Sequence, residues 1–203
     1  MPATTMPCQA WHRRSDERFT LLRGHVTVSD LGHGKRHANK RLGRSLQGKG
    51  RHMTTTVESL SDLSSFVGKE LGTSSWVDVD QARINTFADA TDDHQWIHVD
   101  PERAKDGPFG ETIAHGYLTL SLLIPMWADI LEVRDVKTKV NYGLNKVRFP
   151  SPVPSGSKIR ARATLAAVEP VAGGAQLTID TVVERQGGDK PACVAQLVLR
   201  YLN

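Results

Sequence analysis

The sequence has few cysteines and no long apolar runs. Cys8 and Cys193 are the only cysteines among 203 residues, which excludes a disulfide framework or a cysteine-rich metal cluster and fits a reducing cytoplasm. The first 30 residues lack the continuous apolar stretch of a secretory signal. The most apolar run, 118–130, is interrupted by Pro125 and Asp129 and is shorter than the roughly 20 residues of a spanning helix. We therefore expect a cytoplasmic protein that does not cross a membrane.

Acidic residues are scarce in the first quarter of the chain. Residues 1–52 carry 11 Lys and Arg against 3 Asp and Glu, whereas the remainder carries 15 against 19. The basic part has scattered glycines and almost no apolar periodicity, so it buries too little surface to offset the entropy of ordering. We expect a disordered extension over 1–52 and a globular domain over 53–203.

Two interpretations of the extension stay open. It is sequence upstream of a natural start at Met53, which we favour, or a basic arm that binds nucleic acid or another anionic surface. We do not expect nucleic acid to be the principal partner.

Apolar periodicity predicts a strand and two helices in the first half of the domain. Residues 75–79 read as a short strand, and Asp80 is a good N-cap for a helix over 80–91. A loop over 92–111 carries two prolines and two glycines. Residues 112–131 are apolar on nearly all sides, which is typical of a buried helix that Pro125 ends or kinks.

The second half of the domain is strand-like. Apolar and polar residues alternate over 159–165 and 177–183, a further run follows over 193–202, and Gly-Gly pairs separate these segments. An antiparallel sheet wrapped around one apolar helix fits this order. The predicted fold class is therefore α+β.

The chemistry-bearing segment is 92–100, which holds three carboxylates and two imidazoles. Asp93 and His98 are five residues apart, so on an ideal helix their side chains would point about 140° apart. They converge only if the chain leaves the helix near 94–96, and they then form an Asp–His pair able to hold and activate a water molecule. Taken alone, the segment fits an acidic helix end with solvated histidines equally well.

A second candidate feature opens the apolar helix. Gly116 follows His115 in the segment Ile113-Ala114-His115-Gly116. A glycine in the first helical turn has a backbone N–H without an intrahelical partner, which is a suitable donor to a developing oxyanion. The alternative is that Gly116 only permits close packing and that His115 is a core histidine with a satisfied hydrogen bond.

Together these segments resemble the MaoC-like (R)-specific enoyl-CoA hydratases, and most closely the mycobacterial single-hotdog and nodulation-protein-N-like members. In that family an Asp precedes a His by five residues, and an apolar residue, Asp and Pro follow; here these are Asp93, His98, Val99, Asp100 and Pro101. The family's central helix begins with an apolar-His-Gly segment, which Ile113–Gly116 matches. The run 141–153 looks like the family's segment that leads into the long strands. The resemblance covers 68–203.

The resemblance implies a hotdog fold, pairing of two protomers, and an acyl-CoA thioester as substrate. It implies that Asp93 and His98 are catalytic, that Gly116, Gln95 and His115 bind substrate, and that neither a metal nor a separate cofactor is needed. The implied reaction is the reversible hydration of trans-2-enoyl-CoA to (R)-3-hydroxyacyl-CoA in fatty-acid metabolism.

The chain departs from the family pattern at two positions. Gln95 and Trp96 replace the more usual Asn and Pro, and we expect Trp96 to narrow the acyl pocket, which puts the acyl chain length in doubt.

Four basic residues are candidates for contacting coenzyme A phosphates: Lys146, Arg148, Arg160 and Arg162. Two rival functions remain, a hotdog acyl-CoA thioesterase and a non-catalytic acyl-CoA-binding protein.

Overall fold

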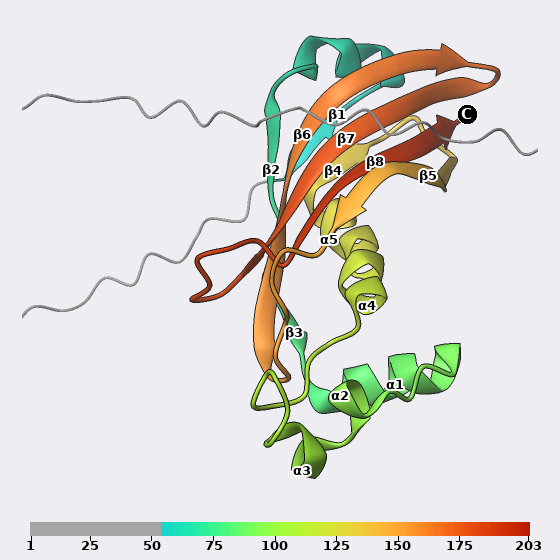
Figure 1. The fold of residues 1–203 in the computed structure, drawn as a ribbon. Coiled ribbons are helices and arrows are strands. Elements are labelled where there is room, and N and C mark those ends of the chain that lie inside the picture. The colour runs from blue at the N-terminus through green and yellow to red at the C-terminus, as the bar shows by residue number, and fades with distance from the viewer. Residues whose placement is uncertain (1–53) are drawn as a thin grey trace, which may run out of the picture. The chain divides into compact units, whose positions relative to one another are not determined.

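The computed structural model describes residues 54–203, and the predicted extension over 1–52 lies outside them. An antiparallel sheet dominates the fold, with strand order β2-β6-β7-β8-β5 (Figure 1). β3 pairs with the first three residues of β6. The strands are β2 (Glu70–Thr73), β3 (Val77–Val79), β5 (Thr138–Arg148), β6 (Ser157–Val171), β7 (Gly174–Arg185) and β8 (Cys193–Leu202). The α+β prediction is confirmed, and the alternating segments are the three long strands β6, β7 and β8.

The strand pairing follows the alternation of apolar residues. Buried Leu165 of β6 lies opposite Ile179 of β7, which in turn lies opposite Leu197 of β8. Because side chains alternate between the two faces of a strand, this register gathers the apolar side chains on one face of the sheet. Two register shifts in β5, at 141–143 and 144–146, accompany the curvature of the sheet.

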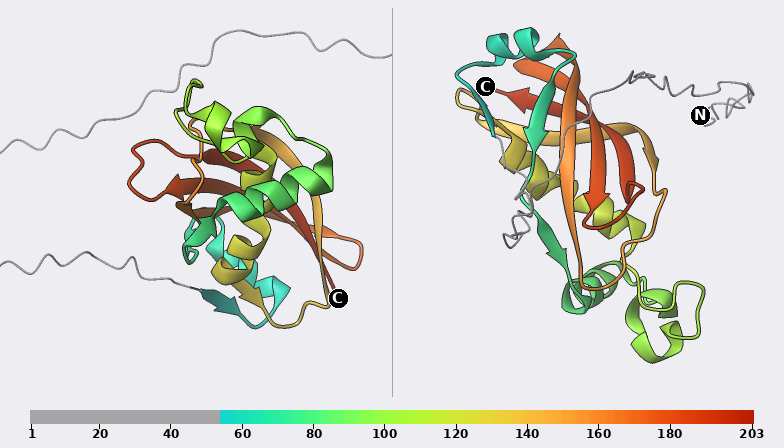
Figure 2. Two further views of the ribbon diagram at one scale, coloured as in Figure 1. Left: turned by 90° about the horizontal axis from the view of Figure 1, so that it is seen from below. Right: turned by 90° about the vertical axis from the view of Figure 1, so that its left-hand side faces the viewer.

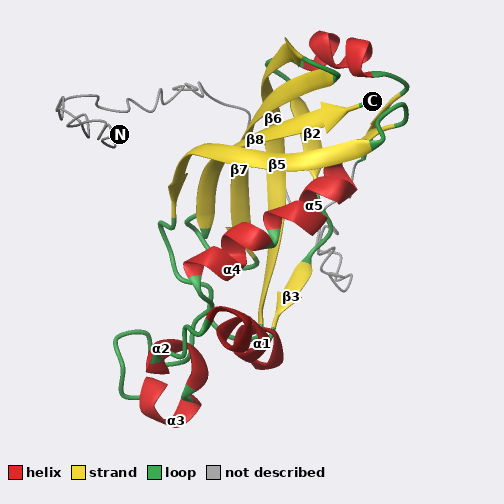
Figure 3. Ribbon diagram, turned by 90° about the vertical axis from the view of Figure 1, so that its right-hand side faces the viewer, coloured by secondary structure: helices red, strands yellow, loops and turns green. Residues whose placement is uncertain are grey.

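The apolar segment 112–131 forms two short helices, α4 (Gly116–Ser121) and α5 (Leu123–Ile130), which confirms the interruption predicted from Pro125. The break at Leu122 has a clear cause, because Pro125 has no N–H to donate to the Ser121 carbonyl and its ring would clash with that oxygen. α4 and α5 follow one another along the concave side of the sheet (Figures 2 and 3).

The helical segment also begins later and ends earlier than predicted. Residues 112–115 are extended, since the Ala114 N–H donates to the Val153 carbonyl and the Ser155 N–H donates to the Thr112 carbonyl. At the other end, β4 (Leu131–Val133) pairs in parallel with β1 (Thr55–Val57), a small sheet that no pattern predicted. The extended start makes Gly116 the first residue of α4.

The core lies between the concave face of the sheet and the two helices. Leu123, Met126 and Ile130 of α5 are almost completely buried. Trp127 donates its indole N–H to the Tyr201 hydroxyl over 2.7 Å, and burial raises the pKa of Tyr201 to about 12. The short 3₁₀ helix η1 (Leu60–Phe66) packs on β6 and contributes Leu63 to the same core.

Three further helices lie beyond one end of the sheet, namely α1 (Gln81–Thr91), α2 (Trp96–Val99) and α3 (Pro101–Ala104) (Figure 3). The Asp80 carboxylate accepts the Arg83 N–H over 2.8 Å, which confirms the predicted N-cap of α1. The predicted loop over 92–111 therefore contains α2 and α3. Among residues 54–203, no helix is long and apolar enough to cross a membrane.

The buried Trp127–Tyr201 hydrogen bond gives a stability prediction. Tyr201→Phe leaves the Trp127 N–H buried without an acceptor, so it should lower the free energy of unfolding by about 1–3 kcal/mol. Urea denaturation measures this change. Tyr117→Phe removes the same hydroxyl at a position that is 70% exposed and should change stability by less than about 0.5 kcal/mol. Equal effects of the two substitutions would contradict the prediction.

Candidate active site

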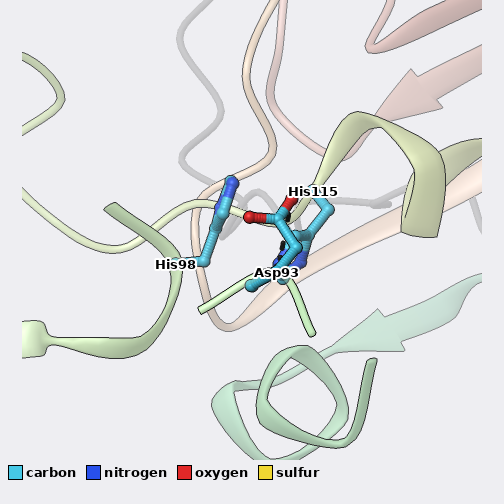
Figure 4. A group of neighbouring side chains, drawn as sticks. All are labelled: Asp93, His98 and His115. Carbon is cyan, nitrogen blue, oxygen red and sulfur yellow. Dashed lines mark hydrogen bonds and ion pairs between the residues drawn. The ribbon is translucent and has the colours of Figure 1, made fainter. Parts of the chain in front are cut away.

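Three ionisable side chains converge where α2 meets the start of α4. Side-chain atoms of Asp93, His98 and His115 lie within 4.8 Å of one another (Figure 4). The convergence begins at Asp92, whose left-handed backbone (φ 58°) ends α1 and turns the chain out of the helix. α2 then carries His98 back toward Asp93. The chain therefore leaves α1 before Asp93 and His98, as their convergence requires. The exit is at Asp92, about two residues before the predicted region 94–96.

His98 is held as a neutral base. Its ring is buried, and its Nδ1 lies 2.7 Å from the Ile113 carbonyl oxygen. A carbonyl only accepts hydrogen bonds, so Nδ1 carries the proton and Nε2 keeps a lone pair. Burial lowers the pKa of His98, an effect that nearby His115 reinforces and that the Ile113 hydrogen bond and the Asp93 charge oppose. The imidazole is therefore unprotonated at neutral pH.

Asp93 supplies a carboxylate at the edge of this cluster. Its side chain is 53% exposed, and its Oδ2 lies 4.0 Å from Nε2 of His115. The same nitrogen lies only 2.9 Å from the main-chain oxygen of Asp93. Because the main-chain oxygen is the nearer acceptor, Nε2–H of His115 donates to the Asp93 carbonyl. His115 therefore does not form an ion pair with the Asp93 carboxylate. The carboxylate stays available to a ligand.

His115 lies behind His98. It is the N-cap residue of α4 and is 2% exposed. Its ring stacks on His98 with centroids 3.8 Å apart and contacts the Phe87 ring at 5.0 Å. We predicted that His115 binds substrate, but it is not among the side chains that line the adjacent cavity.

The cavity beside this cluster has a volume of about 290 Å³. Its lining includes His98, Phe109, Ile113, Gly116, Thr119 and Phe149. As the first residue of α4, Gly116 has an N–H without an intrahelical partner, and it forms no hydrogen bond to another described residue. A Cβ at position 116 would lie 2.9 Å from the Phe149 ring. Glycine therefore permits the close approach of Phe149, whereas the free N–H follows from the position of residue 116 at the start of the helix.

Besides His115, three sequence-predicted residues are absent from the lining of the cavity: Asp93, Gln95 and Trp96. Gln95 is exposed at the start of α2, and its side chain does not line the cavity. Trp96 packs beneath Arg103 and against Gly107. Its ring does not line this cavity, and the expected narrowing of the acyl pocket by Trp96 stays a prediction.

The basic candidates fall into two groups. Arg160 and Arg162 both contact Glu184, and Arg160 also stacks on Trp76, so their charges are already engaged. They line a separate hollow of about 430 Å³ on the outer face of β6 and β7 that contains none of the converging residues. Lys146 and Arg148 are exposed, and neither forms an ion pair within residues 54–203.

Two parts of the site were missed by sequence reasoning. The Ile113 carbonyl that fixes the His98 tautomer is a backbone group and leaves no side-chain signal. Phe109 lies in the predicted loop over 92–111 and Phe149 in the run 141–153, and only the tertiary fold brings both to Gly116.

The spacing of Asp93, His98 and His115 could also accommodate a metal ion. Metal binding through Nε2 of His115 would require loss of the proton that it donates to Asp93, and Nδ1 of the same ring is buried without a partner. The absence of a required metal or cofactor remains a prediction.

The chain was compared with known proteins. Residues 62–186 match the model of the MaoC like domain. The 3-hydroxyacyl-thioester dehydratase Z of Mycobacterium tuberculosis is 54% identical over 148 residues, which are 72% of this chain and 98% of that protein. Nodulation protein N of Rhizobium leguminosarum is 47% identical over 144 residues, which are 69% of this chain and 89% of that protein.

Solved structures show the same fold. The (R)-hydratase from A. caviae involved in PHA biosynthesis superposes with a TM-score of 0.55 at 24% identity, over 66% of this chain and 94% of that one. This likeness bears on the fold alone, and it confirms the predicted hotdog arrangement. Because the family match covers more than half of the chain and the mycobacterial relative is more than half identical, the protein belongs to the MaoC-like domain family.

Proposed function

We propose that the protein is an (R)-specific enoyl-CoA hydratase, which adds water across the C2–C3 double bond of trans-2-enoyl-CoA and catalyses the reverse dehydration in fatty-acid metabolism. The observation that carries the proposal is the unprotonated Nε2 of His98 close to the Asp93 carboxylate, with His98 and Gly116 both lining the adjacent cavity. This set provides a base, a second group to hold water, and a donor for an oxyanion.

The chemistry follows from these three groups. The Gly116 N–H donates to the thioester carbonyl, which draws the π electrons toward oxygen and makes C3 electrophilic. A water molecule held between Asp93 and His98 gives a proton to Nε2 of His98 as its oxygen bonds to C3. The resulting enolate takes up that proton at C2 from the imidazolium, which restores both the thioester and the neutral base.

The relatives support the same reaction class. The mycobacterial protein is named a 3-hydroxyacyl-thioester dehydratase, and dehydration uses the same groups in reverse by microscopic reversibility.

We propose the reducing cytoplasm as the site of action. This location suits the free thiol of Cys193, which is buried and whose pKa is raised by burial to about 11.

Arg148 and Lys146 are our candidates for the coenzyme A phosphates. Arg148 directly precedes Phe149, which lines the cavity, so the backbone of Arg148 lies near the proposed thioester site. Arg160 and Arg162 are weaker candidates, because Glu184 already neutralises much of their charge.

We also propose a homodimer formed through β5. This strand ends the sheet, is exposed along almost its whole length, and carries Val140, Tyr142 and Leu144 on its surface. Two hollows of about 260 and 130 Å³ lie between β5 and the α4–α5 helices, beside exposed Ile124. A long uncovered edge strand next to apolar surface is a template for pairing with a second copy.

Purified protein given trans-2-enoyl-CoA should form (R)-3-hydroxyacyl-CoA, followed as loss of the conjugated double bond with chiral analysis of the product. Asp93→Asn and His98→Ala should each lower kcat by about 10²–10⁴-fold, because each removes a group that contacts the reacting water. Asp92→Asn and His94→Ala change the same residue types at exposed neighbouring positions, and they should retain most of the activity.

The outcomes of this assay separate the rival functions. Release of free coenzyme A would identify a thioesterase, and binding without turnover across chain lengths would identify an acyl-CoA-binding protein. If Asp93→Asn and His98→Ala both kept more than a tenth of the wild-type turnover, the assigned pair would be wrong.

The lowered pKa of His98 predicts the acid limb of the pH profile. The base must be neutral, so kcat/KM falls as the pH drops through the pKa of His98, and burial places that midpoint below the ordinary value of 6.5. Measurement of kcat/KM between about pH 4.5 and 8 tests this. His94→Ala should leave the midpoint unchanged. A midpoint at or above 6.5 would contradict a neutral, buried base.

The proposed dimer can be tested with two substitutions at similar exposure. Leu144 is 42% exposed on β5, and Val67 is 43% exposed at the end of η1. Leu144→Arg should shift sedimentation equilibrium from dimer to monomer, because it places a charge in the apolar interface, whereas Val67→Arg should remain dimeric. A Leu144→Arg protein that still forms dimers would exclude the β5 interface.

A further inference from the structure

We infer that His115 is a positioning residue for Asp93: its Nε2–H, donated to the main-chain carbonyl of Asp93, sets the direction of the Asp93 carboxylate. This inference rests on the proposed function. It assigns His115 a role through Asp93 and the backbone, in place of contact with the substrate.

The segment that carries Asp93 has little else to hold it. Residues 93–95 lie between α1 and α2 and are exposed. The His115–Asp93 contact of 2.9 Å is, within residues 54–203, the one hydrogen bond that joins this segment to a distant part of the chain. A carboxylate on an otherwise untethered turn samples many directions, so a fixed anchor on its own peptide group restricts it most directly.

The donor itself is rigid. The His115 ring is 2% exposed and packs between the His98 and Phe87 rings. Its backbone is held at both ends, because the preceding Ala114 N–H donates to the Val153 carbonyl and the His115 carbonyl accepts the Thr119 N–H over 3.1 Å. The ring therefore cannot follow Asp93 if that residue moves.

The tautomer of His115 follows from its two nitrogens. Nε2 faces a carbonyl, which only accepts, so Nε2 carries the hydrogen. Nδ1 is buried and has no partner, so a proton there would bury a charged N–H without an acceptor, next to His98. The ring is thus a neutral donor. The ionisable groups that face it are Asp93 and His98.

Two substitutions separate the donor from the ring. His115→Phe keeps an aromatic ring against His98 but removes the N–H. His115→Gln removes the ring but can place an amide N–H near the position of Nε2. We expect His115→Phe to lose about 10- to 100-fold in kcat, because a displacement of the carboxylate by about 1 Å is costly, with KM changed by less than threefold. His115→Gln should keep kcat within about fivefold of the wild type.

The order of the two variants decides the question. If His115→Phe is as active as His115→Gln, or more active, the donor is not needed and the inference fails. A second test combines His115→Phe with Asp93→Asn. Since His115 acts through Asp93, the added loss should be less than threefold, whereas multiplied losses would indicate a separate structural role.

A measurement on the wild-type protein covers the case in which His115→Phe does not fold. The ¹⁵N chemical shifts of the histidine rings report which nitrogen carries hydrogen. A neutral Nε2–H tautomer for His115 supports the anchor, and an Nδ1–H tautomer overturns it. The chemical shifts do not depend on turnover, so they test the His115–Asp93 hydrogen bond separately from the proposed function. A wild-type protein that fails to hydrate enoyl-CoA would overturn the proposed function alone.

Discussion

The site depends on the hydrogen bond between Nδ1 of His98 and the Ile113 carbonyl. That contact of 2.7 Å fixes the tautomer that leaves Nε2 as a base. It is paired with a second contact in the opposite direction, because the Ile113 N–H donates to the Ile97 carbonyl over 3.0 Å. The two bonds tie α2 to the segment before α4, so the base and the cavity wall move together. In a buried position such a bond is strong and its loss is costly, since both partners would remain desolvated.

The hydrogen bond from His98 to the Ile113 carbonyl requires an extended backbone over 112–115. A helix through Ile113 would direct its carbonyl along the helix axis toward residue 117, and the oxygen would not be available to His98. The extended segment instead bonds to Val153 and Ser155, which satisfies its buried backbone groups. It also delays the start of α4 to Gly116, so that one backbone choice positions both the acceptor for the base and the free N–H at the cavity.

Local rules account for what could be predicted. Asp80 caps α1 because its carboxylate reaches the Arg83 N–H, and alternating residues give the register of β6, β7 and β8. The Asp93–His98 spacing indicated a non-helical turn, which Asp92 makes. The rest depends on tertiary contacts that a single chain pattern does not encode. The extended start before α4 depends on partners about 40 residues away, and the inward direction of His115 depends on Phe87 and His98.

The division of charge within the cluster explains why its three groups can lie so close. Two protonated imidazoles stacked at 3.8 Å would repel each other, and burial would penalise both. Each ring avoids this by donating its single hydrogen to a backbone carbonyl, His98 to Ile113 and His115 to Asp93. The cluster then carries one negative charge, on the exposed carboxylate of Asp93, and one buried lone pair at Nε2 of His98. A water molecule between them meets an acceptor on either side, which is the arrangement that the addition of water to an activated double bond requires.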